Sequence, residues 1–243
     1  MPEIEEVTIY GSNQWSDLKP LDLKDEDLQM VDWDRYYKEE FDKKQIVLHH
    51  TVSGPGLRGD LETWKKYKSN IATCMIVERD GKINQLFSSK YWAYHIAFSA
   101  NSNKVPAKYH NFTLEQQIAK ASIAIEICNF GGLLKDKDGN FKTYVNSIIP
   151  PNEVIELETP FRGFKYYHAY TDAQLASLKE LVVYLCEKYN IPKKFNSDMF
   201  DINTNALDGQ AGIWTHVSFR ADKSDCSPQP KFIKMLKDIE SGI

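Results

Sequence analysis

The stretch QIVLHHTVSG, residues 45–54, places two adjacent histidines at the end of an apolar run. Residues 46–49 are predicted to form a β-strand, in which consecutive side chains point to opposite faces of the sheet. His49 therefore shares a face with Val47, whereas His50 lies on the other face. A ligand on one side of the sheet can contact only one of the two histidines. Taken by itself, a histidine near a strand end is more often a hydrogen-bonded, half-buried residue than a ligand.

The elements around this strand predict an α/β fold, a single domain with a mixed central β-sheet flanked by helices. A Gly/Pro loop and a short helix over residues 61–68 follow the first strand. Residues 72–87 form a predicted hairpin, because the Asp80–Gly81 pair near their centre is a strong turn signal. Residues 120–132 predict another strand, with isoleucines on one of its faces.

The clearest helix signal begins after Thr171, which is a predicted N-cap with Gln174 as its capping-box partner. Apolar residues recur at helical spacing from there, and Pro192 follows the predicted end. A long polar stretch near residues 192–211 then precedes the motif GIWTH. We predict that this stretch is an insertion over the site rather than a separate domain.

The bulk composition is that of an ordinary globular protein. The chain has 243 residues, of which 42% are hydrophobic and 26% charged. It contains no run of 18 apolar residues, so no membrane span is predicted. The acidic N-terminus lacks the pattern of a secretory signal, and we therefore expect a cytosolic product. The four cysteines form no CxxC pair, which argues against a disulfide framework.

Residues 1–44 are predicted to be an acidic N-terminal extension packed on a catalytic body that spans residues 45–243. Residues 1–42 carry thirteen acidic and four basic side chains. The remainder is mildly basic, at a density far below that of nucleic-acid-binding proteins, so no nucleic-acid partner is expected. The extension is either a short amphipathic helix with Leu28, Val31 and Trp33 inward or an irregular ordered arm. The ordered arm is favoured because a disordered tail would carry fewer aromatic residues. The preference rests on the aromatic side chains of Trp15, Trp33, Tyr36, Tyr37 and Phe41.

Side chains that could bind a metal occur in distant parts of the chain. His49 ends the first strand, and His216 follows the residues GIWT. Asp225 and Cys226 come shortly after His216 in a polar loop, and Glu126 lies on the non-isoleucine face of a later strand. Two histidines with one carboxylate or thiolate are the ligands that a catalytic Zn²⁺ site takes. For Glu126 the competing interpretation is a solvated strand residue, although its neighbours are apolar.

Six motifs together resemble the zinc-dependent N-acetylmuramoyl-L-alanine amidases. This family includes phage endolysins, bacterial anhydro-muropeptide amidases and animal peptidoglycan recognition proteins. The motifs are VLHHT, ATCMIVERDGKINQLF, YWAYHIA, SIAIEICNFG, YTDAQ…LCEKYNIP and WTH…DKSD. Each alone is weak, whereas six in the family's order, from about residue 45 to residue 232, form a specific signal. Residues 1–44 and 192–211 have no counterpart in the resemblance.

The resemblance implies a Zn²⁺ cofactor and indicates which residues hold it. The first metal-binding histidine of the family corresponds to His49, which leaves the histidine after it structural, and the second corresponds to His216. The third ligand is either Asp225, in a Lys-x-Asp version of the motif, or Cys226, in a Thr-x-Cys version. Asp225 is preferred because that alignment also retains Lys223, which would stabilise the oxyanion.

The resemblance also implies the catalytic and substrate-binding residues. Glu126 corresponds to a catalytic glutamate and is the predicted general base, while Thr73 stands where other phage members have a tyrosine. His95 and Trp92, in YWAYHIA, are predicted to contact substrate, with a structural role as the alternative for His95. Trp214 is a weaker candidate for a groove wall. The chemistry implied is metal-assisted hydrolysis of an amide.

The implied substrate is the bond between N-acetylmuramic acid and L-alanine in peptidoglycan or muropeptides. We expect a monomeric phage endolysin that is synthesised in the host cytoplasm and acts on the cell wall after release. A cytoplasmic muropeptide-recycling amidase is the alternative with the same chemistry. A non-catalytic peptidoglycan-binding module and a zinc hydrolase for another amide are the remaining alternatives.

Overall fold

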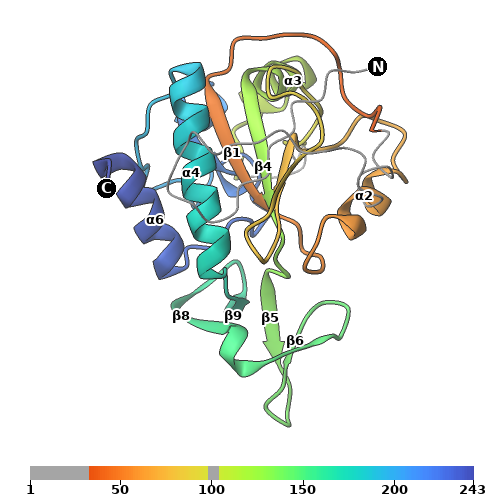
Figure 1. Cartoon of the computed structure of the whole chain (residues 1–243), viewed down its shortest axis with the longest axis vertical. Coiled ribbons are helices and arrows are strands. Elements are labelled where there is room, and N and C mark those ends of the chain that lie inside the picture. Colours follow the sequence, from red (N-terminus) through yellow and green to blue (C-terminus); the bar gives the residue numbers. More distant parts are fainter. Residues whose placement is uncertain (1–32, 98–103) are drawn as a thin grey trace.

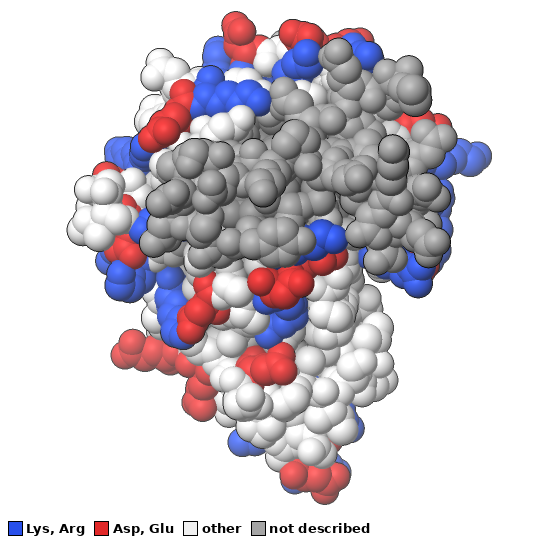
Figure 2. All heavy atoms as spheres, viewed as in Figure 1, with Lys and Arg blue, Asp and Glu red and all other residues white. Residues whose placement is uncertain are grey.

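A computed structural model describes residues 33–97 and 104–243 of the chain (Figure 1). These residues form a central five-stranded sheet with helices packed around it and a second five-stranded sheet at one end of the molecule. Among the described residues, no helix combines the length and the apolarity that a membrane crossing requires. On the described part of the face in Figure 2, basic and acidic side chains are interspersed.

The central sheet is mixed, as predicted, with the strand order β10-β1-β4-β2-β3. Strand β1 (Gln45–His50) runs parallel to both of its neighbours, β4 (Ser122–Ile127) and β10 (Gly212–Thr215). Strand β2 (Met75–Val77) is parallel to β4 and forms an antiparallel hairpin with β3 (Ile83–Gln85). All six residues of β1 are buried, which is expected for a central strand that is covered on both faces.

Strand pairing places one polar pair on the same face of this sheet. His49 in β1 lies directly opposite Glu126 in β4. Paired residues of neighbouring strands point to the same face, so both side chains leave the sheet on one side. His50 lies on the opposite face, as the alternation predicted, and its Nδ1 is 3.1 Å from the hydroxyl of Tyr170. The buried end of β1 thus presents one histidine to each side.

Five α-helices and three 3₁₀ turns complete the described part of the main body and its connections. The capping box predicted at Thr171 and Gln174 is present at the start of α4, which ends at Tyr189 with Asn190 in the left-handed conformation. Helices α4 and α6 lie side by side (Figure 1). The helix predicted over residues 61–68 instead spans residues 58–64. The bounds are α2 (Arg58–Trp64), η2 (Ala107–Tyr109), α3 (Phe112–Ala121), η3 (Pro151–Glu153), α4 (Asp172–Tyr189), α5 (Thr204–Leu207), η4 (His216–Ser218) and α6 (Pro230–Ser241).

The second sheet was not predicted from the sequence pattern. It is antiparallel throughout, in the order β7-β6-β5-β9-β8. The strand predicted over residues 120–132 ends at Ile127, and β5 begins only at Gly132. Several of its strands are too short to show a clear two-residue alternation in the sequence. The strands are β5 (Gly132–Lys135), β6 (Phe141–Lys142), β7 (Ile148–Ile149), β8 (Val154–Phe161) and β9 (Phe164–His168).

Residues 33–44 of the N-terminal extension pack on the body without forming a helix. Trp33 is buried and lies edge-on against Trp64, with the ring centroids 5.8 Å apart. Tyr37 stacks on Trp92 at 4.2 Å and exchanges backbone hydrogen bonds with it. This part of the extension is therefore an ordered arm. Outside the described residues lie Trp15, Leu28 and Val31.

Residues 192–211 pack against the central sheet rather than over the site. Gln45 of β1 donates its side-chain amide to the carbonyls of Ala206 and Gln210. Thr215 donates its hydroxyl to the carbonyl of Met199. No residue of this segment lines the cleft that holds the candidate ligands. The position over the site that the sequence suggested is thus not observed.

Asp60, in helix α2, is a buried carboxyl group. Its Oδ1 accepts a hydrogen bond of 2.7 Å from the hydroxyl of Ser53, whereas Oδ2 has no partner among the described residues. Burial raises the pKa of Asp60 from 3.8 to about 7, because the ionised form is poorly solvated. The folded-state pKa is therefore above the unfolded one. The contribution of Asp60 to the free energy of unfolding is therefore fully present below pH 4 and is lost as the pH rises through 7.

We expect the variant Asp60→Asn, which is neutral at every pH, to remove this dependence. Between pH 5 and pH 8 the wild type should lose on the order of 2 kcal/mol of unfolding free energy relative to the variant. Urea denaturation at each pH measures the difference. The control is Asp138→Asn, at an exposed carboxyl, which should follow the wild type. Parallel pH profiles for the wild type and Asp60→Asn would contradict the prediction.

Candidate metal centre

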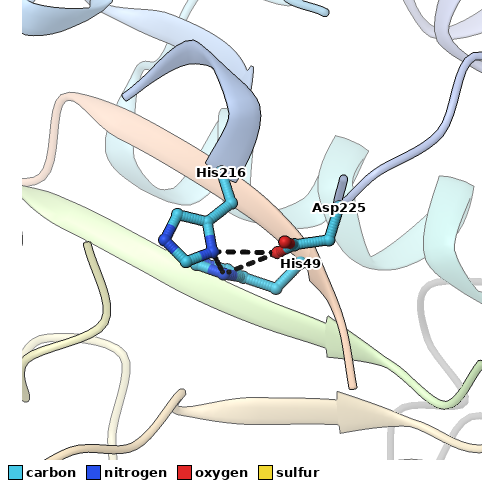
Figure 3. Close-up of side chains that lie close together, drawn as sticks. All are labelled: His49, His216 and Asp225. Carbon is cyan, nitrogen blue, oxygen red and sulfur yellow. Dashed lines mark hydrogen bonds and ion pairs between the residues drawn. The ribbon is translucent and has the colours of Figure 1, made fainter. Parts of the chain in front are cut away.

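Three side chains from separate parts of the chain converge at one point (Figure 3). His49 comes from the end of β1, His216 begins the turn η4 directly after β10, and Asp225 lies in the following loop. The Nδ1 atoms of the two histidines are 3.0 Å apart. Oδ2 of Asp225 lies 2.9 Å from Nδ1 of His216 and 3.3 Å from Nδ1 of His49. All three residues are buried.

The spacing of these atoms fits a single zinc ion. A tetrahedral Zn²⁺ with bonds of about 2.0–2.1 Å holds neighbouring ligand atoms roughly 3.3 Å apart, close to the distances seen here. Within residues 33–97 and 104–243, no other group of three His, Cys, Asp or Glu side chains converges in this way. Two imidazoles and one carboxylate also leave a fourth position for water or substrate, as catalytic zinc sites require.

Electrostatics favour the protonation states that a metal needs. Burial, followed by the neighbouring His216, lowers the pKa of His49 to about 4, so its imidazole is neutral at neutral pH. Burial alone would raise the pKa of the Asp225 carboxyl, but His216 and His49 hold that pKa well below its usual range. A neutral imidazole and an ionised carboxylate are the forms that bind a cation.

Hydrogen bonds select the metal-binding nitrogen of His216. Its Nε2 lies 2.8 Å from the carbonyl oxygen of Ile96, which can only accept a hydrogen bond. Nε2 therefore carries the proton and donates it to that carbonyl. Nδ1 keeps its lone pair and faces Asp225 and His49. This is the outer support that metal-binding histidines typically have.

A longer chain of hydrogen bonds selects the nitrogen of His49. The hydroxyl of Ser122 donates to the carbonyl of Ile118 at 2.7 Å and so accepts from Nε2 of His95 at 2.8 Å. With its proton on Nε2, His95 accepts from Nε2 of His49 through Nδ1, at 3.1 Å. His49 is then left with a free lone pair on Nδ1, the atom that faces His216. The chain of contacts thus orients the first ligand.

These contacts of His95 favour a structural role, the alternative to the predicted substrate contact. His95 lines the same cleft as the ligands, but its two ring nitrogens are engaged by His49 and Ser122. We expect His95→Ala to weaken zinc affinity by roughly 10- to 100-fold, the usual cost of losing such a support. Competition with a fluorescent chelator measures the affinity. His110→Ala, at an exposed histidine, is the control, and equal affinities for the two variants would contradict this role.

Of the two candidates for the third ligand, the structure brings Asp225 to the histidines and leaves Cys226 away from them. Cys226 is fully buried, and its thiol lies beside the hydroxyl of Tyr170. Burial, followed by the charge of Asp225, raises the pKa of this thiol well above its usual range. A thiol that stays protonated in an apolar setting is a poor metal ligand.

The predicted general base, Glu126, lines the cleft beside the ligands. Its Oε2 is buried and has no hydrogen-bond partner among the described residues. Burial, followed by the nearby Asp225, raises the pKa of this carboxyl well above its usual range. Lys223 lines the same cleft. A carboxyl group with a free oxygen next to a metal site is suited to accept and return a proton.

The cleft that contains these groups has a volume of about 820 Å³. Its walls come from the end of α2, residues 69–73, residues 94–97, the start of α3 and the loop 220–225. Thr73, the position of the alternative family tyrosine, is part of this lining.

The structure does not bring the two predicted tryptophans to the cleft. Trp92 is 3% exposed, stacks on Tyr37 and donates its indole N–H to Glu39. Trp214 is 1% exposed and donates to the carbonyl of Gln210. Neither residue lines the cleft, so each supports the fold instead of forming a groove wall.

Some contributors to the site are not among the residues predicted from the sequence. Ser122 supports His95, and Ile96 supports His216 through its carbonyl. The alternation of β4 gave a signal for Ser122, because a polar residue four positions before Glu126 lies on the same face. A backbone carbonyl leaves no such signal, since every residue has one.

A buried His–His–Asp centre in an open cleft, next to a half-buried carboxyl group, defines a site of the metallohydrolase class. The model of the family described as N-acetylmuramoyl-L-alanine amidase matches residues 41–230. The chain belongs to this family of peptidoglycan amidases.

Among curated proteins, none matches the chain. The solved structure of PlyL has 12% sequence identity and a TM-score of 0.45, with 86% of this chain and 91% of that chain covered. The amidase LysC from Clostridium intestinale URNW has 16% identity and a TM-score of 0.42, with coverage of 83% and 85%. The Ph2119 endolysin from the Thermus scotoductus MAT2119 bacteriophage has 12% identity and a TM-score of 0.41, with coverage of 85% and 90%.

Proposed function

We propose that this protein is a zinc-dependent enzyme that hydrolyses the amide bond between N-acetylmuramic acid and L-alanine in peptidoglycan. The observation that carries the proposal is the convergence of His49, His216 and Asp225 beside Glu126 in one open cleft. A non-catalytic binding module would not need a complete ligand set with a proton acceptor next to it. Membership of the amidase family supports the choice of bond.

The residues of the cleft have distinct roles in the proposed reaction. His49, His216 and Asp225 would hold a Zn²⁺ ion, which would supply a Lewis acid for the scissile carbonyl and would lower the pKa of a bound water toward about 7. Glu126 accepts the proton of the attacking water and returns it to the departing amine of L-alanine. The ammonium group of Lys223 stabilises the negative charge that develops on the carbonyl oxygen. His95 holds His49 in the required tautomer.

We further propose that the protein acts as a monomeric phage endolysin, made in the host cytoplasm and active on the cell wall after release. This proposal rests on the resemblance of its motifs to the family that includes such enzymes. A recycling amidase would act on small soluble muropeptides instead. Rates on intact sacculi and on soluble anhydro-muropeptides, measured with the same enzyme, separate the two roles.

The test of the reaction uses purified peptidoglycan and the zinc-loaded protein. We expect new L-alanine α-amino groups to appear with the wild type and none above background with His49→Ala. Wild-type protein that sediments with peptidoglycan but releases no amino groups would establish a binding module and overturn the enzyme. Release of a different amine would assign the chemistry to another amide.

A further inference from the structure

An exposed aromatic side chain lies at the rim of the cleft. Phe112, the first residue of α3, is 66% exposed although it is a large apolar residue. Tyr67, just after α2, is 50% exposed and also lines the cleft. Aromatic side chains that line a cleft are a common feature of ligand-binding sites. The cleft lining therefore includes exposed aromatic side chains as well as the candidate metal ligands.

The ring of Phe112 rests on a supported partner. Its centroid is 5.8 Å from that of Tyr94, with the two planes inclined by 31°. Tyr94 is in turn held edge-on by Trp92 at 5.2 Å and by Tyr37 at 5.9 Å, and its hydroxyl accepts a hydrogen bond from Gln116. We call Phe112 and Tyr94 the aromatic platform. Tyr94, the base of the platform, is fixed by packing, so ligand binding would cost the protein little conformational entropy.

The chemistry of the platform fits the ring of a sugar. A pyranose presents an apolar C–H face to an aromatic ring, while its hydroxyl groups remain at the edge for polar partners such as the tyrosine hydroxyl. An extended peptide is usually held by backbone hydrogen bonds along a strand edge, with pockets for alternate side chains. Phe112 begins a helix, and the backbone N–H and C=O of Tyr94, which forms a β-bridge with Ile71, are already bonded to Asn70 and Ala72, so the platform offers no free strand edge. A carbohydrate is therefore the better match.

The size of the cleft leaves room for this additional sugar. Its volume of about 820 Å³ lies toward the upper end of the roughly 300–1,000 Å³ of ordinary small-molecule sites. Resting on the proposed function, we propose that the platform binds a sugar of the glycan strand other than the muramic acid that carries the scissile bond. The preferred substrate is then a glycan polymer rather than a one-sugar muropeptide.

The test compares two soluble substrates with the zinc-loaded enzyme. One is a tetrasaccharide of alternating N-acetylglucosamine and N-acetylmuramic acid bearing peptides, and the other is N-acetylmuramic acid bearing the same peptide. We expect Phe112→Ala to raise KM for the tetrasaccharide by roughly five- to tenfold, the size of one lost ring contact. The kcat value and the KM for the one-sugar substrate should not change. Phe112→Trp should restore the low KM.

Tyr144→Ala is the matched control, because Tyr144 is 68% exposed and lies outside the cleft lining. It should behave as the wild type with both substrates. Equal effects of Phe112→Ala on the two substrates, or no effect on either, would overturn the platform.

A binding measurement separates this proposal from the proposed function. Calorimetric titration with N-acetylglucosamine tetrasaccharide requires no hydrolysis and should show a similar rise in Kd for Phe112→Ala. Unchanged Kd, or no binding by the wild type, would count against the platform. If binding of the N-acetylglucosamine tetrasaccharide depends on Phe112 but neither peptide-bearing substrate is cleaved, the platform is supported and the proposed amidase function is contradicted.

Discussion

The variant Asp225→Ala is expected to lose its zinc, and its amidase activity is expected to be more than about a thousandfold lower than that of the wild type. The substitution removes one of the three ligand atoms and the only anion among them, which lies 2.9 Å and 3.3 Å from the two histidine nitrogens. Treatment of the wild type with a chelator should cause the same loss, and added zinc should restore the activity. Metal analysis of the purified variants and initial rates on peptidoglycan measure both effects.

Cys226→Ala is the informative comparison, because the two residues are neighbours and the family motif admits either as the ligand. The thiol of Cys226 lies beside Tyr170, so this variant should keep its zinc and its activity. Asp222→Ala, in the same loop, should also keep its zinc. Loss of metal from Cys226→Ala with metal retained in Asp225→Ala would transfer the ligand role to the thiolate. Full wild-type activity after exhaustive chelation would exclude any metal mechanism.

Glu126→Gln is expected to lower kcat by roughly 10²- to 10⁴-fold, the usual contribution of a general acid–base residue. Glutamine has nearly the same shape but cannot accept the proton of the attacking water. The zinc content should remain that of the wild type, because Glu126 is not among the converging ligand side chains. A KM that changes little would show that the substitution acts on the chemical step.

The control for this variant is Glu158→Gln, at an exposed position of β8, which should have wild-type rates. Circular dichroism and thermal unfolding establish that both variants are folded. The assignment of Glu126 fails if Glu126→Gln keeps a kcat within a few-fold of the wild type. Loss of zinc from this variant would instead indicate that Glu126 supports the metal.

Several features of the site follow from local patterns in the sequence. The alternation of β1 separates His49 from His50, and the alternation of β4 separates Glu126 from the isoleucines. The capping box at Thr171 was likewise predictable, because it depends on residues three positions apart. The turn between β2 and β3, in which the backbone N–H of Gly81 donates to the carbonyl of Glu78, is local in the same sense. Such features depend on neighbours in the chain, and a single sequence displays them.

Other features depend on residues that are far apart in the chain. The choice between Asp225 and Cys226 is decided by the packing of the cysteine against Tyr170. His95 is engaged by His49 and Ser122, so its role could not be read from the motif YWAYHIA. Trp92 is enclosed by the arm residue Tyr37 and therefore does not reach the cleft. The second sheet is built from strands whose short alternation carries little signal.

The sequence by itself determined the fold class and the residue types able to hold a zinc ion. Only the tertiary structure decided whether Asp225 or Cys226 faces the two histidines, which groups His95 contacts and which aromatic residues reach the cleft. The physical reason is that the direction of a side chain along a strand or helix follows from local backbone geometry. Its partners across the fold follow from packing between distant segments, which no local pattern encodes.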